Sequence, residues 1–255
     1  WATKTFAPQK LTGEPQPREK EGWVLVFEDD FNGKELDKSK WQTQPYWGNR
    51  YNPGYHYNWF SEEAIRMTDS SVVRFCVRDT MVFDTSAVPY GCGYLGNFPV
   101  FTTVHGYFEA RCRVPGGNAV WPAFWLVSHE SWPPEIDIFE FYGSKGIHRW
   151  ESALHWGTAE NKKRDTRVHK VPDPTEDFHV YGLEWTEEYI IWYFDGKVVR
   201  KAKKELQDFT KAMQVVFNMG LMNNEHSATG DFDLPSDFEI DYVRVYEVQG
   251  IKEYK

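Results

Sequence analysis

The 255-residue sequence contains few cysteines, no metal-binding cysteine or histidine pairs and no phosphate-binding loop. Its three cysteines, Cys76, Cys92 and Cys112, are an odd number that does not suit a disulfide framework. We interpret them as isolated thiols in the core, with one bridge plus a free thiol as the alternative. Neither a Cys-x-x-Cys nor a His-x-x-x-His pair suggests zinc, and a glycine-rich phosphate loop is absent.

Charge and hydropathy argue against two further classes of protein. Lys and Arg number 29 against 38 Asp and Glu, a net charge of −9, whereas a protein that binds duplex nucleic acid presents a basic face. No run of about 18 apolar residues occurs, so we expect no membrane span. The chain begins at Trp1 without a methionine, which we interpret as a mature form that is secreted, periplasmic or at the cell surface.

Aromatic residues are abundant, with 12 Trp, 14 Tyr and 18 Phe making up 17% of the chain. This exceeds what one core needs. Surplus Trp and Tyr rings are typical of binding surfaces, where an apolar ring face and a polar edge suit sugar rings, peptides or bases.

Short runs with a period of two indicate strands. In residues 106–114, Phe108 and Ala110 share one face while Glu109 and Arg111 share the other. Many such runs, separated by Gly, Pro, Asn and Asp, favour an all-β sandwich or barrel. Residues 201–211 alone resemble a short helix.

The sequence indicates one main domain. Residues 1–20 are polar and contain three prolines, so we interpret them as an N-terminal arm or linker. No internal repeat or change of composition follows, and residues 21–255 therefore read as a single domain. We expect this domain to act as a monomer.

Three acids lie in an otherwise apolar run. Glu135 and Asp137 are two residues apart and share one face of a strand, and a β-bulge near residues 138–139 would bring Glu140 to the same face. Acids in such a strand are costly unless they point into a wet cleft. Paired carboxyls about 5–5.5 Å apart suit a retaining glycosidase, and about 6.5–9.5 Å an inverting one. A solvent-facing acidic strand and a site for a divalent cation are the alternatives.

The segment Glu135-Ile-Asp-Ile-Phe-Glu140 resembles the active-site strand of family 16 glycoside hydrolases. The resemblance is to the version with an extra bulge residue, as in laminarinases, agarases, porphyranases and carrageenases. It extends over roughly residues 23–247, through segments in the family's order: 27–33, 106–111, 121–125, 177–185, 195–197 and 241–246.

The resemblance implies a concanavalin-like β-jelly-roll sandwich of two curved antiparallel sheets with a concave substrate cleft. It implies that Glu135 is the nucleophile, Glu140 the acid/base and Asp137 their helper, in a retaining mechanism without a cofactor for catalysis. Asp30 and Asp241 match positions that hold a structural Ca²⁺ in many relatives, with Asp in place of the usual Glu at the first.

The resemblance also implies substrate-binding residues. Trp121 and Trp125 match tryptophans beside the cleaved bond, and His155 and Trp156 match a His-aromatic pair of laminarinase-like members. Core packing of the tryptophans and a structural role for His155 are the alternatives.

Two further segments suggest substrate contacts. An Asn-rich aromatic stretch supplies Asn49, Arg50 and Trp59 as partners for sugar hydroxyls and rings, with an ordered surface loop as the alternative. Residues 162–167 form a basic patch that would suit a sulfated or uronic-acid substrate, unless it is simply solvated.

We therefore expect a retaining endo-β-glycanase with a polysaccharide substrate. The segment 121–125 favours a laminarin-like β-glucan. Ser144 after the acid strand, the aromatic stretch and the basic patch favour a β-galactan such as agar, porphyran, carrageenan or a mucin-type chain. The alternative from another class is a non-catalytic, lectin-like jelly roll, and transglycosylation would use the same residues.

Overall fold

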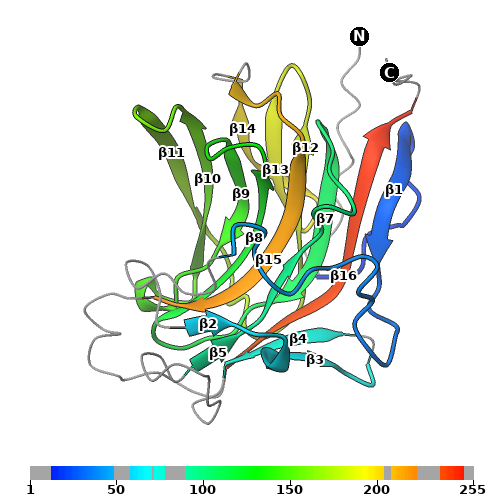
Figure 1. Ribbon diagram of the computed structural model, residues 1–255, viewed down its shortest axis with the longest axis vertical. Coiled ribbons are helices and arrows are strands. Elements are labelled where there is room, and N and C mark those ends of the chain that lie inside the picture. Colours follow the sequence, from blue (N-terminus) through cyan, green and yellow to red (C-terminus); the bar gives the residue numbers. More distant parts are fainter. Residues whose placement is uncertain are drawn as a thin grey trace.

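Two curved antiparallel sheets pack face to face and form a β-jelly-roll sandwich, as predicted (Figure 1). The structure is a computed structural model that describes residues 13–48, 58–70, 72–77, 90–203, 208–222 and 236–249. Two complete helical elements lie within these ranges, the single 3₁₀ turns η1 (Glu62–Ala64) and η2 (Gly143–Lys145), and Asp208 is also in 3₁₀ conformation.

The outer sheet has eight strands. Seven of them follow one another in space, and β1 (Trp23–Asp29) pairs with β16 beside them. In spatial order the seven are β14 (Lys197–Ala202), β13 (Ile190–Phe194), β12 (His179–Trp185), β7 (Gly106–Arg113), β16 (Ser236–Val248), β4 (Val73–Val77) and β3 (Ile65–Met67).

The second sheet, which we call the cleft sheet, has six strands. Their order is β11 (Lys162–Lys170), β10 (Arg149–Gly157), β9 (Glu135–Glu140), β8 (Val120–Ser128), β15 (Met213–Leu221) and β6 (Tyr94–Gly96). A small parallel pair, β2 (Asn58–Phe60) and β5 (Tyr90–Cys92), completes the described strands.

Aromatic side chains fill the space between the two sheets. Phe139 of β9 contacts Tyr181 of β12 with ring centroids 4.2 Å apart, which joins the sheets directly. Phe124 and Phe217 stack at 4.5 Å on neighbouring strands of the cleft sheet. Phe139 is fully buried, and truncating such a ring to alanine costs about 3–5 kcal/mol. Because its inner face is committed to this core, the cleft sheet has its other face available for substrate.

The two-residue turn Asp195-Gly196 joins β13 and β14. Both residues have positive φ, 47° and 74°, which is the backbone of a tight hairpin turn. The helix expected over residues 201–211 is wrong at its start, because Lys201 and Ala202 end β14. Residues 204–207 lie outside the described part.

The described part of the N-terminal arm, residues 13–20, lies against the outer sheet rather than forming a linker. Arg111 donates to the Gly13 carbonyl at 2.7 Å. Lys20 pairs at 3.0 Å with Glu109, whose side chain is fully buried. This segment is therefore part of the folded domain.

Two of the three cysteines can be located with their side chains. Cys92 and Cys112 are buried and free, as expected for isolated core thiols. The side chain of Cys76 lies outside the described part, so its pairing stays a prediction.

Candidate active site

The three predicted acids lie on the cleft-facing side of strand β9. Glu135 pairs with Val127 and Glu140 with Ala123 of β8, so six residues of β9 lie opposite five of β8. The register with both neighbouring strands shifts around residues 138–139. The predicted β-bulge is thus confirmed, and it returns Glu140 to the face of Glu135.

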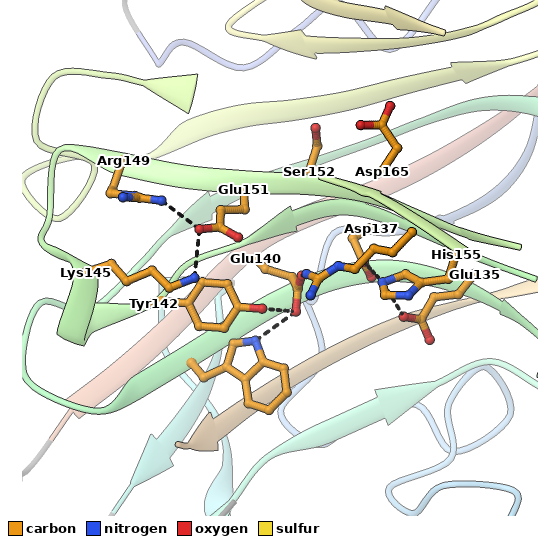
Figure 2. A network of polar contacts seen from close by, with 12 residues as sticks. Glu135, Asp137, Glu140, Tyr142, Lys145, Arg149, Glu151, Ser152, His155 and Asp165 are labelled. Atoms are coloured by element: carbon orange, nitrogen blue, oxygen red, sulfur yellow. Dashed lines mark hydrogen bonds and ion pairs between the residues drawn. The ribbon is translucent and has the colours of Figure 1, made fainter. Parts of the chain in front are cut away.

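Donors from three directions hold Glu140. Trp121 Nε1 and Tyr142 Oη both donate to Oε1, at 3.1 and 2.7 Å. Arg164 Nη2 lies 3.4 Å from Oε2. Figure 2 shows the Tyr142 hydroxyl directed at this carboxylate. Oε1 thus accepts from two neutral donors, and Oε2 faces the Arg164 guanidinium.

Glu135 and Asp137 share one histidine. His155 Nε2 lies 3.1 Å from Asp137 Oδ2 and 3.4 Å from Glu135 Oε1 (Figure 2). Trp132 Nε1 donates to the second Glu135 oxygen at 2.9 Å, and Trp192 Nε1 donates to the Asp137 backbone carbonyl at 3.0 Å. These contacts fix both acids against the floor of the cleft.

Burial shifts the protonation equilibria of this cluster. Burial raises the pKa of Glu135 to about 8; neighbouring Asp137 adds to the rise and His155 opposes it. Burial, with a contribution from Glu140, raises the pKa of Asp137 well above its usual range. Burial also lowers the pKa of His155. The acid cluster therefore retains protons at neutral pH, while the imidazole is neutral.

A second polar network lies next to Glu140. Lys145 and Arg149 both contact Glu151 Oε1, at 2.8 and 2.7 Å, and Glu151 is the cross-strand partner of Glu140 (Figure 2). The Lys145 ammonium also lies 4.0 Å above the ring of Tyr142. Glu151 thus partners two cations close to the acid strand.

A cleft of about 630 Å³ crosses the cleft sheet from β15 to β11, and the three acids line it together with Tyr142, Lys145, His155 and Arg164. Trp125 donates to Asn218 Oδ1 at 2.8 Å and approaches Trp47 at 6.3 Å, and Trp121 stacks on Tyr142 at 5.7 Å. Half-buried rings with an amide beside them suit the apolar faces and hydroxyls of sugars.

The cleft contains most of the sequence-predicted contacts that the structure describes. Trp121, Trp125 and His155 line it, as expected. Trp156 was expected there too, but it packs in the core at 8% exposure, so that prediction is wrong. Adjacent residues of a strand face opposite sides, and His155 and Trp156 therefore cannot both face the cleft of a regular strand. Asn49 and Arg50 lie outside the described residues.

Trp59 is also corrected. On β2 the neighbouring Phe60 lines the cleft, and Trp59 is not among the described lining residues. The alternation along β2 explains the exchange, because Phe60 and Asn58 share one face and Trp59 takes the other.

Several residues of the cleft have no role that was predicted from the sequence. Tyr142 carried a signal, since it lies two residues beyond Glu140, the spacing that relates Glu135 to Asp137. Arg164 belongs to the basic patch, but only the pairing of β10 with β11 places it opposite His155. The other lining residues without a predicted role are Trp47, Phe60, Ala123, Trp132, Lys145, Asn218, Gly220 and Met222.

The alternative that the acidic strand faces solvent is wrong. Asp137 and Glu140 are 3% and 6% exposed. One geometric observation supports the alternative of a divalent-cation site: ligand atoms of Glu135, Asp137 and His155 lie within 4.8 Å of one another. The same atoms contact one another directly, with His155 Nε2 3.1 Å from Asp137 and 3.4 Å from Glu135.

The expected calcium pair does not form a suitable site. Asp241 pairs with Arg111 at 2.7 Å, and Asp30 Oδ1 lies 3.6 Å from Arg244. Ca²⁺ prefers six to eight oxygen ligands, whereas each of these carboxylates faces a guanidinium. Structural calcium at Asp30 and Asp241 stays a prediction that this geometry does not favour.

Two curated relatives match much of the chain. An endo-1,3-1,4-β-glycanase of Rhizobium meliloti (strain 1021) is 27% identical over 243 residues, covering 88% of this chain and 51% of the relative. A glucan endo-1,3-β-glucosidase of Cryptopygus antarcticus is 31% identical over 196 residues, covering 69% of this chain and 68% of the relative. The chain spans about half the length of the first curated relatives it matches.

Solved structures and a family model agree with these relatives. The X-ray structure of an endo-β-1,3-glucanase from Pyrococcus furiosus matches with a TM-score of 0.73 at 25% identity, over 89% of this chain and 95% of that chain. The described part of the chain holds no helix of sufficient length and apolarity to cross a membrane. The model of the glycosyl hydrolases family 16 matches residues 100–244, which include the acid strand and both walls of the cleft. The chain therefore belongs to glycosyl hydrolases family 16.

Proposed function

We propose that the protein is a retaining endo-β-glycanase that hydrolyses internal β-linkages of a glucan or galactan chain. The observation that supports this best is the position of Glu135 and Glu140 on one face of bulged strand β9, on the floor of an aromatic cleft. Two carboxyls in different environments are what double displacement requires. The activities for which the two relatives are named make a β-1,3-linked glucan the first substrate to test.

In the first step Glu135 attacks the anomeric carbon as a carboxylate. The glycosidic bond breaks, and its electron pair goes to the leaving oxygen, which takes the proton of Glu140. The two donors on Glu140 Oε1 hold the group in place while the carboxyl delivers the proton. Arg164 then stabilises the carboxylate that remains.

In the second step Glu140 takes a proton from water. The water oxygen attacks the anomeric carbon, the ester bond to Glu135 breaks, and Glu135 leaves as a carboxylate. Two displacements at one carbon retain its configuration.

The groups around Glu135 stabilise the ionised carboxylate that attacks the anomeric carbon. Ionised Glu135 is stabilised by the Trp132 indole N–H and by the positive charge that develops at the anomeric carbon. Asp137 keeps its own proton because burial raises its pKa, which limits the repulsion that ionised Glu135 experiences. Asp137 is accordingly a positioning residue beside the nucleophile.

A panel of polymers tests this proposal: β-1,3-glucan, mixed-linkage glucan, agarose, porphyran, carrageenan and mucin glycans, with products sized over time. We expect oligosaccharide ladders from at least one polymer, and NMR of early products should show the β-anomer. Glu135→Ala should abolish turnover, whereas the exposed Glu160→Gln should not change it. Binding without cleavage of any polymer, equal for Glu135→Ala and wild type, would instead establish a lectin-like protein.

We further propose that the enzyme acts outside the cytoplasm, in the periplasm or at the cell surface, because a polymeric substrate does not cross a membrane unaided. Cell fractionation with an antibody to the protein tests this, and a purely cytoplasmic signal would contradict it.

A further inference from the structure

Strand β11 brings basic side chains to one end of the cleft. It is an end strand of the cleft sheet, and its register pairs Arg164 with His155 and Lys162 with Gly157. Residues paired across antiparallel strands share a face, so Lys162 and Arg164 lie on the side of His155, which lines the cleft. Lys163 lies between them and faces the other side.

The two cations lie beside the two glutamates. The side chain of Arg164 is 47% exposed; it lies 3.4 Å from Glu140 and also donates to the Tyr142 hydroxyl, which leaves the rest of its five N–H donors available to a ligand. The Lys162 ammonium lies 4.6 Å above the ring of Trp132, whose N–H donates to Glu135. Both cations are therefore within reach of a sugar unit next to the cleaved bond.

Other basic residues near the cleft already have acidic partners. Lys145 and Arg149 share Glu151, and Arg200 pairs with Asp165 at 2.9 Å. Lys162 has no carboxylate within ion-pair distance among the residues that the structure describes. The charge of Lys162 is thus not neutralised by a carboxylate of the described residues, whereas Arg164 shares Glu140.

The opposite half of the cleft is uncharged. The described lining residues from β8, β15 and the adjoining segments are aromatic, aliphatic or amide side chains, among them Trp47, Trp125 and Asn218. The cleft is therefore asymmetric: the described lining residues on the β8 and β15 side of strand β9 are uncharged, and the β11 cations lie on the other side, together with Trp132. A substrate that is neutral along its whole length would make no use of the cationic side.

We propose, on the basis of the proposed function, that the β11 side of the cleft is a subsite for a sugar unit bearing an anionic substituent, a sulfate ester or a carboxylate. Arg164 offers paired N–H donors that match the oxygens of either group, and Lys162 adds a second charge two residues away on the same face. The neutral half of the cleft binds uncharged units of the same chain by ring stacking.

Matched substrates test the proposal. One β-linked backbone is used in its neutral form, its sulfated form and a uronic-acid form, and kcat/KM is measured at about 50 and about 500 mM salt. For wild-type enzyme, kcat/KM should be about tenfold higher for at least one anionic form than for the neutral form at low salt. This ratio should fall towards one at high salt. The sulfated and uronic-acid arms show which acid the subsite takes.

Lys162→Gln should lower the ratio of kcat/KM for the preferred anionic form to that for the neutral form by about fivefold, the upper range for one partly exposed ion pair. Lys162→Arg should keep the preference. The matched control is Lys163→Gln, which removes the same charge from the opposite face of β11. A thermal melt of each variant verifies that it is folded.

Turnover of the neutral form with no anionic preference, or equal effects of Lys162→Gln and Lys163→Gln, would overturn this inference and leave the proposed function intact. Turnover of none of the forms or of the wider polymer panel would overturn both.

Discussion

Replacing Glu135 by glutamine should stabilise the protein, and the gain should grow with pH. Burial raises the pKa of this carboxyl to about 8, against an ordinary value of 4.5. Between these pH values the folded protein keeps a proton that the unfolded chain has released, so wild-type stability falls as the pH rises through this window. Glutamine does not titrate, so the stability of the variant does not fall over this pH window.

The size of the effect follows from the width of the window. At about 1.36 kcal/mol per pH unit, the interval from 4.5 to about 8 corresponds to at most about 5 kcal/mol. Asp137 competes for the same protons, and an amide accepts a weaker hydrogen bond from Trp132 than a carboxylate does. We therefore expect a net gain of about 2–3 kcal/mol at pH 9, or roughly 4–12 °C in Tm for a chain of this size.

Urea and thermal unfolding of both proteins at about pH 4, 6, 7.5 and 9 measure the effect. The control is Glu160→Gln, an exposed acid for which the difference from wild type should stay flat across the series. A gain that is the same at every pH, or a variant less stable than wild type at pH 9, would refute the reasoning that burial holds a proton on Glu135.

Three further changes have expected outcomes. Tyr142→Phe removes a 2.7 Å hydrogen bond to Glu140 and should lower kcat about tenfold with little change in KM, as steady-state kinetics would show; an unchanged kcat would contradict this role. Trp156→Phe should lower the free energy of unfolding by about 1–3 kcal/mol and leave KM unaltered, whereas a raised KM would return this ring to the cleft. Lys20→Met removes the nearer cationic partner of buried Glu109, leaves Arg244 at 3.8 Å, and should cost about 3 kcal/mol in urea unfolding, with most of it restored by adding Glu109→Gln; equal stability of the single and double variants would argue against a buried pair.

The acid strand was predictable because two simple rules apply to it. Side chains alternate along a strand, and acids in an apolar strand need a wet face. Together they required a bulge to bring Glu140 beside Glu135, and the register of β9 contains it. The same alternation corrects Trp156, since its neighbour His155 already occupies the cleft side.

The rest of the site depends on which strands pair and in what register, which local sequence patterns do not encode. Arg164 reaches Glu140 only because β11 folds back on β10 with Arg164 opposite His155. Asn218 meets Trp125 because β15 lies beside β8, although 93 residues separate the two in sequence. Such contacts between distant segments arise from tertiary packing.

Strand β11 has a consequence beyond the cleft. It ends the cleft sheet, and an open strand edge can pair with a strand of another molecule and begin aggregation. Charged side chains along an edge oppose this, because two such edges repel each other. Five of its nine residues are basic: Lys162, Lys163, Arg164, Arg167 and Lys170. Engineering a neutral cleft by removing these charges would therefore also remove a barrier to intermolecular β-pairing, so solubility sets a limit on how far this edge can be altered.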